Sequence, residues 1–592
     1  MKTSTLLHPL LLTACGLALV FKAAAEPQVT FLPAAEQVGC YDFLEVTLRV
    51  AGSTAANPFT DVAVTGTFTP PGAAALAVDG FCDSPDGSVH RIRFMPAQPG
   101  LHPYRISYRE GAFERTYAGT FEAVDSKRKG VLRVDPEHPW HFRWDGSKER
   151  FFWNGTTAYW LAGWDDTTIR QSLDRLDHLK VTRVRAALSG RVRDGRAWFE
   201  NVFPADKFSF LLNPWVARDP ASVEEPGFDV TRFNVAYWQK FERLLRHAWT
   251  KDMVISVIFY VDGSRPGADP FGKSGMGGPD EQRYYRYAMA RLAPFANVMW
   301  DLANEYRHFR TDAWAEQMGA FVKACDPYDH LTSTHGHGDF RFRTSGWADF
   351  AMYQSWDEHG GYEFMLRNRR EQEKTGRIIP QVNEEYGYED HYPQGWGENR
   401  TAPARSAETR TRLAWEIALA GGYQTSGERA DRGTGWGPDT GGGWINGRGD
   451  DTMTLFEQQA PLFDFFTSIT WWTLAPAPDL VTSFQPATPP AAKAAAANPA
   501  SAHPRPRALA MRNPDGDLAV VYLAGGGTVA LKADGLKDGL RPLWFSPRDG
   551  GIRVARALRT KVYRSPDASD WILLFRTPCN CSFREYDEEV ER

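Results

Sequence analysis

The sequence predicts an α/β protein: a (β/α)8 TIM barrel flanked by an N-terminal Ig-like β-sandwich and a small C-terminal β-domain. Strand-like and helix-like segments alternate through the middle of the chain, which predicts parallel strands joined by helices. The length of 592 residues exceeds what one compact core normally holds. Short strands separated by Gly, Pro and Asp turns occupy both ends of the sequence, which indicates β-domains there.

Residues 26–125 are predicted to form the β-sandwich. Segments such as 44–50 and 90–94 alternate apolar and polar residues, as half-buried strands do. About a hundred residues in this pattern is a typical size for a sandwich. Cys40 and Cys82 both lie in this region and are candidates for a disulfide in an oxidising compartment.

Residues 126–484 are predicted to form the barrel. The expected strands are 151–157, 181–188, 253–261, 298–302, 331–334, 349–353, 378–383 and 422–426. Helical periodicity separates most of them, and 235–249 is the clearest example. No clear helix separates the fifth strand from the sixth. A doubly wound open sheet is the alternative fold, but no glycine-rich phosphate loop follows the first strand, which counts against a nucleotide-binding version.

The chain beyond the barrel divides into a linker and a second β-domain. Residues 485–507 are rich in Ala and Pro, a composition typical of linkers. Residues 508–592 contain further strand-like segments, including 518–523 and 571–575. We therefore expect a small C-terminal β-domain whose role the sequence does not specify.

The N-terminus has the features of a targeting segment. Lys2 precedes an apolar run, and Ala23-Ala24-Ala25 is a small-residue cleavage site, so residues 1–25 are predicted to be a signal peptide. The four residues ending at Cys15 resemble a lipoprotein processing site, so a lipid on Cys15 remains the alternative. Both alternatives predict an exported protein, periplasmic or extracellular, and no later segment has transmembrane character.

Composition narrows the partners that the protein can have. The net charge of −5 is small for this length and gives no support for nucleic-acid binding. The 21 Trp and 21 Tyr residues offer flat faces that suit sugar rings, although large barrels also bury aromatic residues. No residue spacing indicates a metal site or a cofactor. The expected partner is a carbohydrate substrate, and the oligomeric state stays open.

Two carboxylates are expected at the barrel mouth, because barrel enzymes carry their active sites at the C-terminal ends of the strands. The fourth strand runs into Asn304-Glu305, and the seventh runs into Glu384-Glu385. Such a pair suits glycoside hydrolysis, in which one carboxyl group protonates the leaving oxygen and the other attacks the anomeric carbon or activates water. A helix-capping role is the simpler alternative for Glu305 alone, but the joint placement favours the catalytic pair.

The pattern of Asn304-Glu305 after an apolar strand, with a second Glu ending strand seven, resembles glycoside hydrolase clan A, including family 5. This resemblance implies that Glu305 is the acid/base, that Glu385 is the nucleophile of a retaining reaction, and that Asn304 contacts the sugar 2-hydroxyl. It also implies an arginine on strand two that supports the nucleophile. Arg183 and Arg185 are both candidates, and register favours Arg185.

Residues 152–161, FWNGTTAYWL, are similar to the opening of the apiosidase-like barrel family, known as domain of unknown function 4038. Segments 78–81 and 93–96 resemble the β-sandwich domain of unknown function 5060, which often precedes such barrels. The chain departs from the apiosidases at strand four, where they usually carry an Asp after glycines and this sequence has Asn304-Glu305. The resemblance therefore specifies a retaining reaction better than it specifies the sugar.

Glu384 and Glu385 are adjacent, and adjacent residues of a regular strand point to opposite faces. Only one of them is therefore expected to enter the barrel mouth. Family register favours Glu385 and leaves Glu384 facing the helical layer or an ion pair. The mechanism then needs Glu385 ionised and Glu305 protonated at the start, with the pKa of Glu305 raised by the neighbouring charge and by partial desolvation.

Four aromatic side chains are further predicted substrate contacts. Trp160 follows strand one, His335 ends strand five, Tyr353 ends strand six, and Trp436 lies in a glycine-rich loop after strand eight. A buried core role is the alternative for Tyr353. The sequence as a whole predicts an exported retaining glycoside hydrolase that cleaves O-glycosidic bonds of plant or algal polysaccharide or oligosaccharide. The alternative is a non-catalytic protein that binds glycan or matrix on a barrel scaffold.

Overall fold

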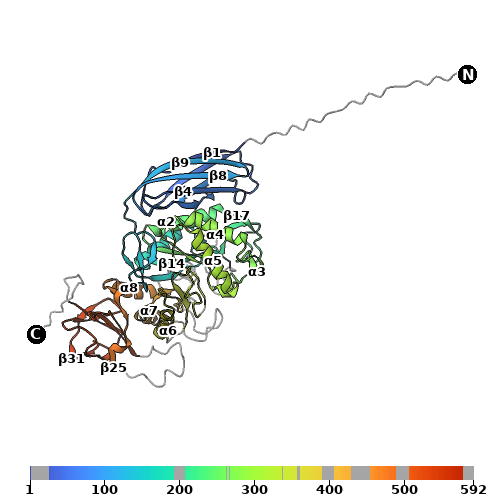
Figure 1. Cartoon of the computed structure of the whole chain (residues 1–592). Coiled ribbons are helices and arrows are strands. Elements are labelled where there is room, and N and C mark those ends of the chain that lie inside the picture. Colours follow the sequence, from blue (N-terminus) through green and yellow to red (C-terminus); the bar gives the residue numbers. More distant parts are fainter. Residues whose placement is uncertain are drawn as a thin grey trace.

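The computed structural model describes residue 1 and residues 26–191, 207–261, 263–265, 267–336, 338–356, 360–389, 406–427, 454–487 and 506–577. A central barrel of strands and helices carries one β-domain before it and one after it in the chain (Figure 1). The two β-domains lie on different sides of the barrel (Figure 1). The predicted barrel with a β-domain on either side of it in the chain is therefore confirmed.

The barrel contains eight parallel strands. They are β13 (Asn154–Thr157), β14 (Arg183–Arg191), β18 (Val254–Tyr260), β19 (Val298–Asp301), β20 (Thr332–Ser333), β21 (Ala351–Gln354), β22 (Gln381–Glu385) and β23 (Tyr423–Ser426). Their order is β20-β19-β18-β14-β13-β23-β22-β21, so each strand lies beside its neighbours in the sequence and the first pairs with the last. This order belongs to a barrel and excludes the doubly wound alternative.

The strands β20 and β21 stand at the two ends of the sheet order, and isolated hydrogen bonds to the residues just before β21 close the barrel between them. The Asp349 N–H donates to the Thr332 carbonyl at 2.9 Å, and the Ser333 hydroxyl donates to the Phe350 carbonyl at 2.7 Å. The described residues that connect these two strands contain no helix, as the sequence predicted.

Helices cover the outside of the barrel. They are α1 (Asp166–His178), α2 (Val235–Trp249), α3 (Gly272–Gly275), α4 (Pro279–Leu292), α5 (Asp312–Cys325), α6 (Gly361–Lys374), α7 (Ala407–Leu419) and α8 (Leu455–Thr467). Their ends follow local capping rules. The Asp165 carboxylate accepts the Thr168 N–H at 2.7 Å and so begins α1. The helix α2 has the predicted bounds and buries the predicted face, including Phe241, Leu244 and Leu245.

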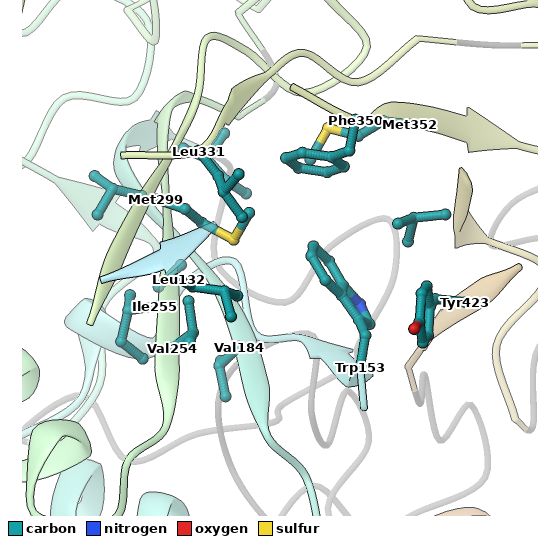
Figure 2. Close-up of a cluster of buried hydrophobic side chains, with 14 of the residues drawn as sticks. Leu132, Trp153, Val184, Val254, Ile255, Met299, Leu331, Phe350, Met352 and Tyr423 are labelled. Carbon is teal, nitrogen blue, oxygen red and sulfur yellow. The ribbon is translucent and has the colours of Figure 1, made fainter. Parts of the chain in front are cut away.

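Large apolar side chains fill the N-terminal half of the barrel. Trp153, Met299, Phe350 and Tyr423 meet there, as Figure 2 shows. A small sheet precedes the first barrel strand and consists of β10 (Leu132–Val134), β11 (Phe142–Trp144) and β12 (Arg150–Phe151). Phe142 of this sheet packs against Trp153 with ring centroids 5.1 Å apart. The small sheet therefore closes the end of the barrel opposite the strand ends that carry Glu305 and Glu385.

The N-terminal β-domain consists of two sheets that enclose an apolar core. One sheet contains β1 (Gln28–Pro33), β3 (Leu44–Ala51), β7 (Val89–Phe94) and β6 (Phe81–Cys82). The other contains β2 (Gln37–Gly39), β9 (Phe113–Val124), β8 (Gly100–Glu110), β4 (Val62–Phe68) and β5 (Leu76–Asp79). The predicted disulfide is wrong, because Cys40 and Cys82 are both buried free thiols. The Cys82 thiol instead donates to the Ser84 carbonyl at 3.1 Å.

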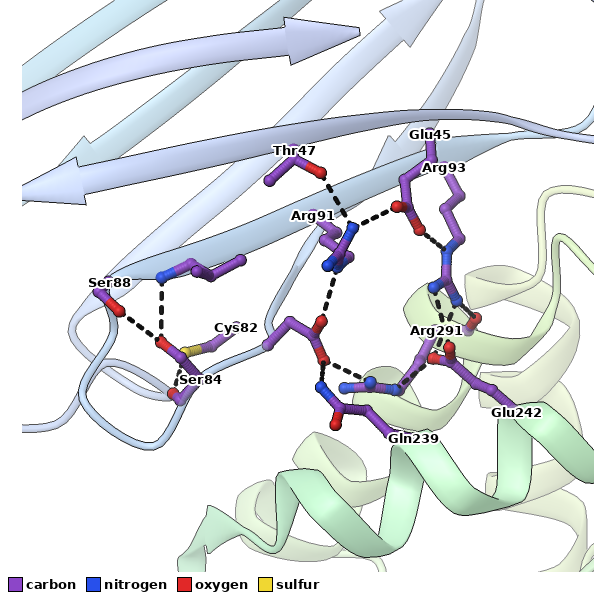
Figure 3. Close-up of polar contacts among 12 residues, drawn as sticks. Glu45, Thr47, Cys82, Ser84, Ser88, Arg91, Arg93, Gln239, Glu242 and Arg291 are labelled. Atoms are coloured by element: carbon purple, nitrogen blue, oxygen red, sulfur yellow. Dashed lines mark hydrogen bonds and ion pairs between the residues drawn. The ribbon is translucent and has the colours of Figure 1, made fainter. Parts of the chain in front are cut away.

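Buried ion pairs join this domain to the barrel (Figure 3). The Arg93 guanidinium on β7 donates to Glu242 of α2 at 2.9 Å and to the backbone carbonyl of Arg291 in α4 at 2.8 Å. The Arg291 guanidinium lies 2.5 Å from both Asp83 and Glu242. Arg93 is 3% exposed and Arg291 is fully buried. The charges are thus enclosed between the two domains, where Glu45 and the Tyr287 hydroxyl are further partners of Arg93 and Arg291.

The C-terminal β-domain also consists of two sheets. One contains β24 (Ala475–Pro476), β26 (Arg507–Arg512), β27 (Leu518–Ala524), β33 (Trp571–Arg576), β29 (Arg541–Phe545) and β30 (Ile552–Val554). The other contains β25 (Val481–Pro486), β28 (Gly527–Leu531), β32 (Val562–Arg564) and β31 (Ala557–Arg559). Arg412 of α7 pairs with Asp570 at 2.7 Å, and Arg507 pairs with Glu416 at 2.7 Å, which holds this domain against the barrel. None of the described helices is long and apolar enough to cross a membrane.

Candidate active site

Glu305 follows β19 in a left-handed backbone conformation, with φ of +47°. A residue other than glycine pays on the order of 1–3 kcal/mol for this conformation, so neighbouring contacts must hold it. The Glu305 N–H donates to Nδ1 of His335 at 3.3 Å, and the preceding Asn304 N–H donates to the Tyr260 carbonyl at 2.9 Å. The Glu305 side chain remains 24% exposed, with its carboxylate 3.5 Å from Nε2 of His308.

Glu384 and Glu385 both point into the barrel, unlike adjacent residues of a regular strand, and Glu384 forms the ion pair that was one of its two expected environments. The pairing of β21 with β22 shifts register between Tyr353 and Gln354, so that Glu385 lies opposite Gln354. This irregularity interrupts the alternation of side chains, as a β-bulge does. Glu384 pairs with Arg183 of β14 at 2.7 Å, and because β14 and β22 are not neighbours in the sheet, that contact crosses the interior.

Four side chains around the Glu385 carboxylate have defined distances, and the Tyr388 hydroxyl also lowers its pKa. The Tyr159 hydroxyl donates a short hydrogen bond to one oxygen, and the Gln354 amide donates to the other at 3.1 Å. The Arg185 guanidinium lies 3.7 Å away, and Nε2 of His335 lies 4.0 Å away. Since Nδ1 of His335 accepts the Glu305 N–H, the imidazole proton sits on Nε2 and faces Glu385. His335 therefore connects the two candidate catalytic residues.

Burial and the negative charge of Glu305 raise the pKa of Glu385 from 4.5 to about 7. Arg185 and the tyrosine hydroxyl groups oppose this change, but burial dominates because the carboxylate loses its water. The pKa of Glu385 thus lies close to neutrality, and its ionisation at the start of the reaction stays a prediction. The negative charge of Glu305 contributes to this rise in the pKa of Glu385, so the two carboxylates lie at the same barrel mouth.

Arg185 is the fully buried hub beneath these groups. Its guanidinium donates to Asn304 at 2.9 Å and to Asp301 at 3.1 Å. The Asn304 side-chain oxygen also lies 3.1 Å from the Tyr159 hydroxyl oxygen. Burial raises the pKa of Asp301 to about 6, against the opposing effect of Arg185. Arg185 thus ties the ends of strands two, four and seven together.

Two predicted substrate contacts are not brought to this cluster. Trp160 is completely buried and packs edge-on against Phe210 at 5.3 Å, so it is a packing residue and not an exposed sugar platform. The Tyr353 hydroxyl bonds to Gln381 and to Arg343, away from Glu385, so its predicted substrate contact is also wrong. Trp436 lies outside the described residues.

Sequence reasoning missed Tyr159 and Gln354, each by one position. Tyr159 directly precedes Trp160 in the motif that carries the family resemblance, and Gln354 directly follows Tyr353. A shift of one residue moves a strand side chain to the opposite face, which explains the error at strand six. The sequence reasoning also missed Asp301, although its position at the end of β19 is where barrel sites form.

Family models match two parts of the chain. Residues 144–426 match the catalytic domain described as apiosidase-like, and residues 37–109 match the domain of unknown function 5060. Both resemblances drawn from the sequence are thereby confirmed. None of the curated proteins matches the sequence significantly.

Solved structures share the fold. A Bacteroides vulgatus protein described as a candidate glycoside hydrolase superposes with a TM-score of 0.68 at 21% identity, covering 92% of this chain and 100% of its own. A family 5 glycoside hydrolase from Bacteroides vulgatus gives a TM-score of 0.55 at 15% identity, covering 76% and 93% of the two chains. Another glycoside hydrolase gives 0.56 at 16% identity, covering 76% and 97%. At these identities the likeness shows a glycoside hydrolase-like fold.

The raised pKa of Glu385 predicts a pH-dependent stability. Between pH 4.5 and about pH 7 the folded protein keeps a proton on Glu385 that the unfolded chain has released, so stability falls as pH rises. In Glu385→Gln this dependence is absent. We expect the wild type to lose up to about 3 kcal/mol relative to the variant across this range. Urea unfolding of both proteins at several pH values measures it, and a constant difference would contradict the prediction.

The buried pair of Glu384 with Arg183 predicts a large loss of stability when one partner is removed. Glu384→Gln leaves the Arg183 charge without its closest carboxylate, so we expect a loss of about 3–5 kcal/mol in the free energy of unfolding. The double variant with Arg183→Met should lose less than the sum of the two single variants. Urea unfolding measures all three, and additive losses would show that the pair is not coupled.

Proposed function

We propose that this protein is a retaining glycoside hydrolase with Glu305 as acid/base and Glu385 as nucleophile. The observation that carries the proposal is that Glu305 and Glu385, from the ends of strands four and seven, both contact His335. Its Nδ1 accepts the Glu305 backbone N–H, and its Nε2 lies 4.0 Å from the Glu385 carboxylate. The match to an apiosidase-like catalytic domain supports the same class of reaction. A substrate with O-glycosidic bonds, from plant or algal polysaccharide or its fragments, fits this class.

The proposed reaction proceeds by double displacement. Glu385 attacks the anomeric carbon while Glu305 transfers its proton to the glycosidic oxygen, and the aglycone leaves as an alcohol. Glu305, now ionised, takes a proton from water, and the hydroxide attacks the anomeric carbon and releases Glu385. The sugar keeps its configuration because it is inverted twice.

The surrounding residues have distinct parts in this proposal. Tyr159 and Gln354 donate to the two oxygens of Glu385 and orient it, and Arg185 stabilises its charge. Ionisation of Glu385 favours protonation of Glu305, because each charge raises the pKa of the other carboxyl group. Asn304, held by Arg185, offers an amide beside the nucleophile that suits the sugar 2-hydroxyl.

An activity screen on defined oligosaccharides and aryl glycosides, including apiosides, tests the proposal. We expect at least one substrate to be cleaved, with retention seen in the NMR spectrum of the first-formed product. Glu385→Gln is the matched control and should be inactive on the same substrate. If no substrate is cleaved and Glu305→Gln leaves glycan binding unchanged, the protein is instead a non-catalytic glycan-binding protein.

Export is part of the same proposal and has its own test. Residues 1–25 are proposed to be removed as a signal peptide, so that the mature chain begins at Glu26. N-terminal sequencing of protein recovered from a secreting host measures this directly. A mature chain that begins at a lipid-modified Cys15 would instead establish a lipoprotein.

A further inference from the structure

One edge of the C-terminal β-domain concentrates positive charge. Residues 548–564 contain six cationic residues and a single acidic residue, Asp549, in a chain whose net charge is −5. The cations are Arg548, Arg553, Arg556, Arg559, Lys561 and Arg564, and we call this group the cationic edge. It covers β30, β31 and the residues that flank them.

The cationic edge spans the borders of both sheets of the domain. The strand β30 ends the order of one sheet and β31 ends the order of the other. In Figure 1, β31 lies at the outer side of the domain, away from the barrel helices. Arg553, Arg556 and Arg559 are exposed, and no carboxylate of the described residues lies within 4.0 Å of their guanidinium groups.

Two of the guanidinium groups pack on the ring of Trp571. Those of Arg548 and Arg553 lie 5.4 and 5.6 Å from the centroid of the Trp571 ring, within the range of cation–π contacts. Trp571 is itself buried and donates its indole N–H to Asp567 at 2.8 Å. The cations at this end of the edge are therefore positioned before any ligand arrives, which lowers the entropic cost of binding.

The need to keep edge strands from pairing with other chains does not by itself explain why the charge of the cationic edge is positive. Charged side chains on edge strands prevent sheet-to-sheet pairing, but charges of either sign serve that purpose. The six cations outnumber Asp549 and Asp567, which lies 3.7 Å from Arg548, so the edge keeps a positive field that attracts polyanions over a distance of about 10 Å at moderate salt. Arginine in particular matches the geometry of carboxylate and sulfate groups.

We propose that the cationic edge binds an acidic polysaccharide, a chain that carries carboxylate or sulfate groups on successive sugars. The choice of a carbohydrate rests on the function proposed above, because a glycoside hydrolase gains from an anchor on its polymer. The edge lies on a domain separate from the barrel mouth, so it holds the polymer without contributing to bond cleavage.

Binding to polygalacturonate, compared with uncharged dextran, tests the proposal by affinity electrophoresis at several NaCl concentrations. The wild type should bind polygalacturonate at low salt and release it as the NaCl concentration rises, and it should not bind dextran. The triple variant Arg553→Gln, Arg556→Gln and Arg559→Gln should bind about tenfold more weakly. The corresponding triple change to Lys keeps the charge and should retain most of the binding.

The matched control is the triple variant Arg49→Gln, Arg105→Gln and Arg115→Gln, which removes the same charge from exposed strands of the N-terminal domain. It should bind as the wild type does. Equal losses in both Gln triples, or binding without salt dependence, would refute the proposal. The measurement needs no hydrolysis and can be repeated in Glu385→Gln, so failure of the proposed catalytic function would be distinguishable from failure at this surface.

Two other occupants would also overturn the proposal. Vesicles with anionic lipids test the first, because Val554 and Leu558 on this edge are 56% and 58% exposed and suit a membrane surface. Binding to those vesicles but not to polygalacturonate would identify a membrane partner. The acidic segment 585–591 of this chain is the second, and binding seen only after removal of residues 578–592 would show that this segment occupies the edge.

Discussion

Glu385→Ala should abolish turnover of every substrate that the wild type cleaves, with kcat falling on the order of 10⁴-fold or more. Without the carboxylate, no covalent intermediate forms, and the hydrogen bonds from Tyr159 and Gln354 have no acceptor. Initial rates on the best aryl glycoside measure this effect. Removal of a buried group that prefers to be neutral should leave the protein folded, which circular dichroism checks.

Azide separates Glu385 from its neighbour Glu384. Added azide should not restore a retained product in Glu385→Ala, because the external nucleophile attacks from the side that the carboxylate has vacated. Glu384→Ala is the comparison, since both side chains enter the barrel. Rescue of Glu384→Ala by azide, with an inverted product, would make Glu384 the nucleophile and contradict our assignment.

Glu305→Ala should lower kcat by about 10²- to 10⁴-fold, the usual contribution of a general acid/base. The loss should be smallest for aryl glycosides with good leaving groups, because they need little protonation. Azide should partly rescue this variant and yield a glycosyl azide of retained configuration, because azide replaces the water that Glu305 would activate. Product analysis by NMR measures both the rescue and the configuration.

Two outcomes of the Glu305→Ala experiment would contradict the acid/base role of Glu305. A variant that loses equal activity on good and poor leaving groups would assign Glu305 a structural role, such as holding the left-handed turn before His308. An inverted azide product would exchange the two roles. Glu305→Gln keeps the shape of the side chain and controls for any change in that turn.

The sequence predicted most of the fold because the barrel strands are apolar runs set between periodic helices. The bounds of α2 follow from spacing alone. The pairing of Glu305 with Glu385 followed from the rule that barrel sites form at strand ends. These features depend on local composition and on the order of elements, which a single sequence carries.

The details of the site required three-dimensional contacts. The irregular pairing after Tyr353 places Glu384 and Glu385 on the interior side of the barrel. No residue type in the sequence predicts this irregularity. The same shift replaces Tyr353 by Gln354 as the neighbour of Glu385. The raised pKa of Glu385 likewise depends on burial by groups distant in the sequence, so it could not be read from the residues around it.

The ion pairs between Arg93, Glu242 and Arg291 have a consequence for the evolution of the chain. A barrel without its first 125 residues would present Glu242 and Arg291 to water, and would lose Arg93 from Glu242 and Asp83 from Arg291. Transfer of the N-terminal domain to an unrelated enzyme would take Glu242 away from Arg93 and leave it with Glu45 alone. The two units should therefore be inherited together, as one piece of architecture, with substitutions on either side of the boundary constrained by the other.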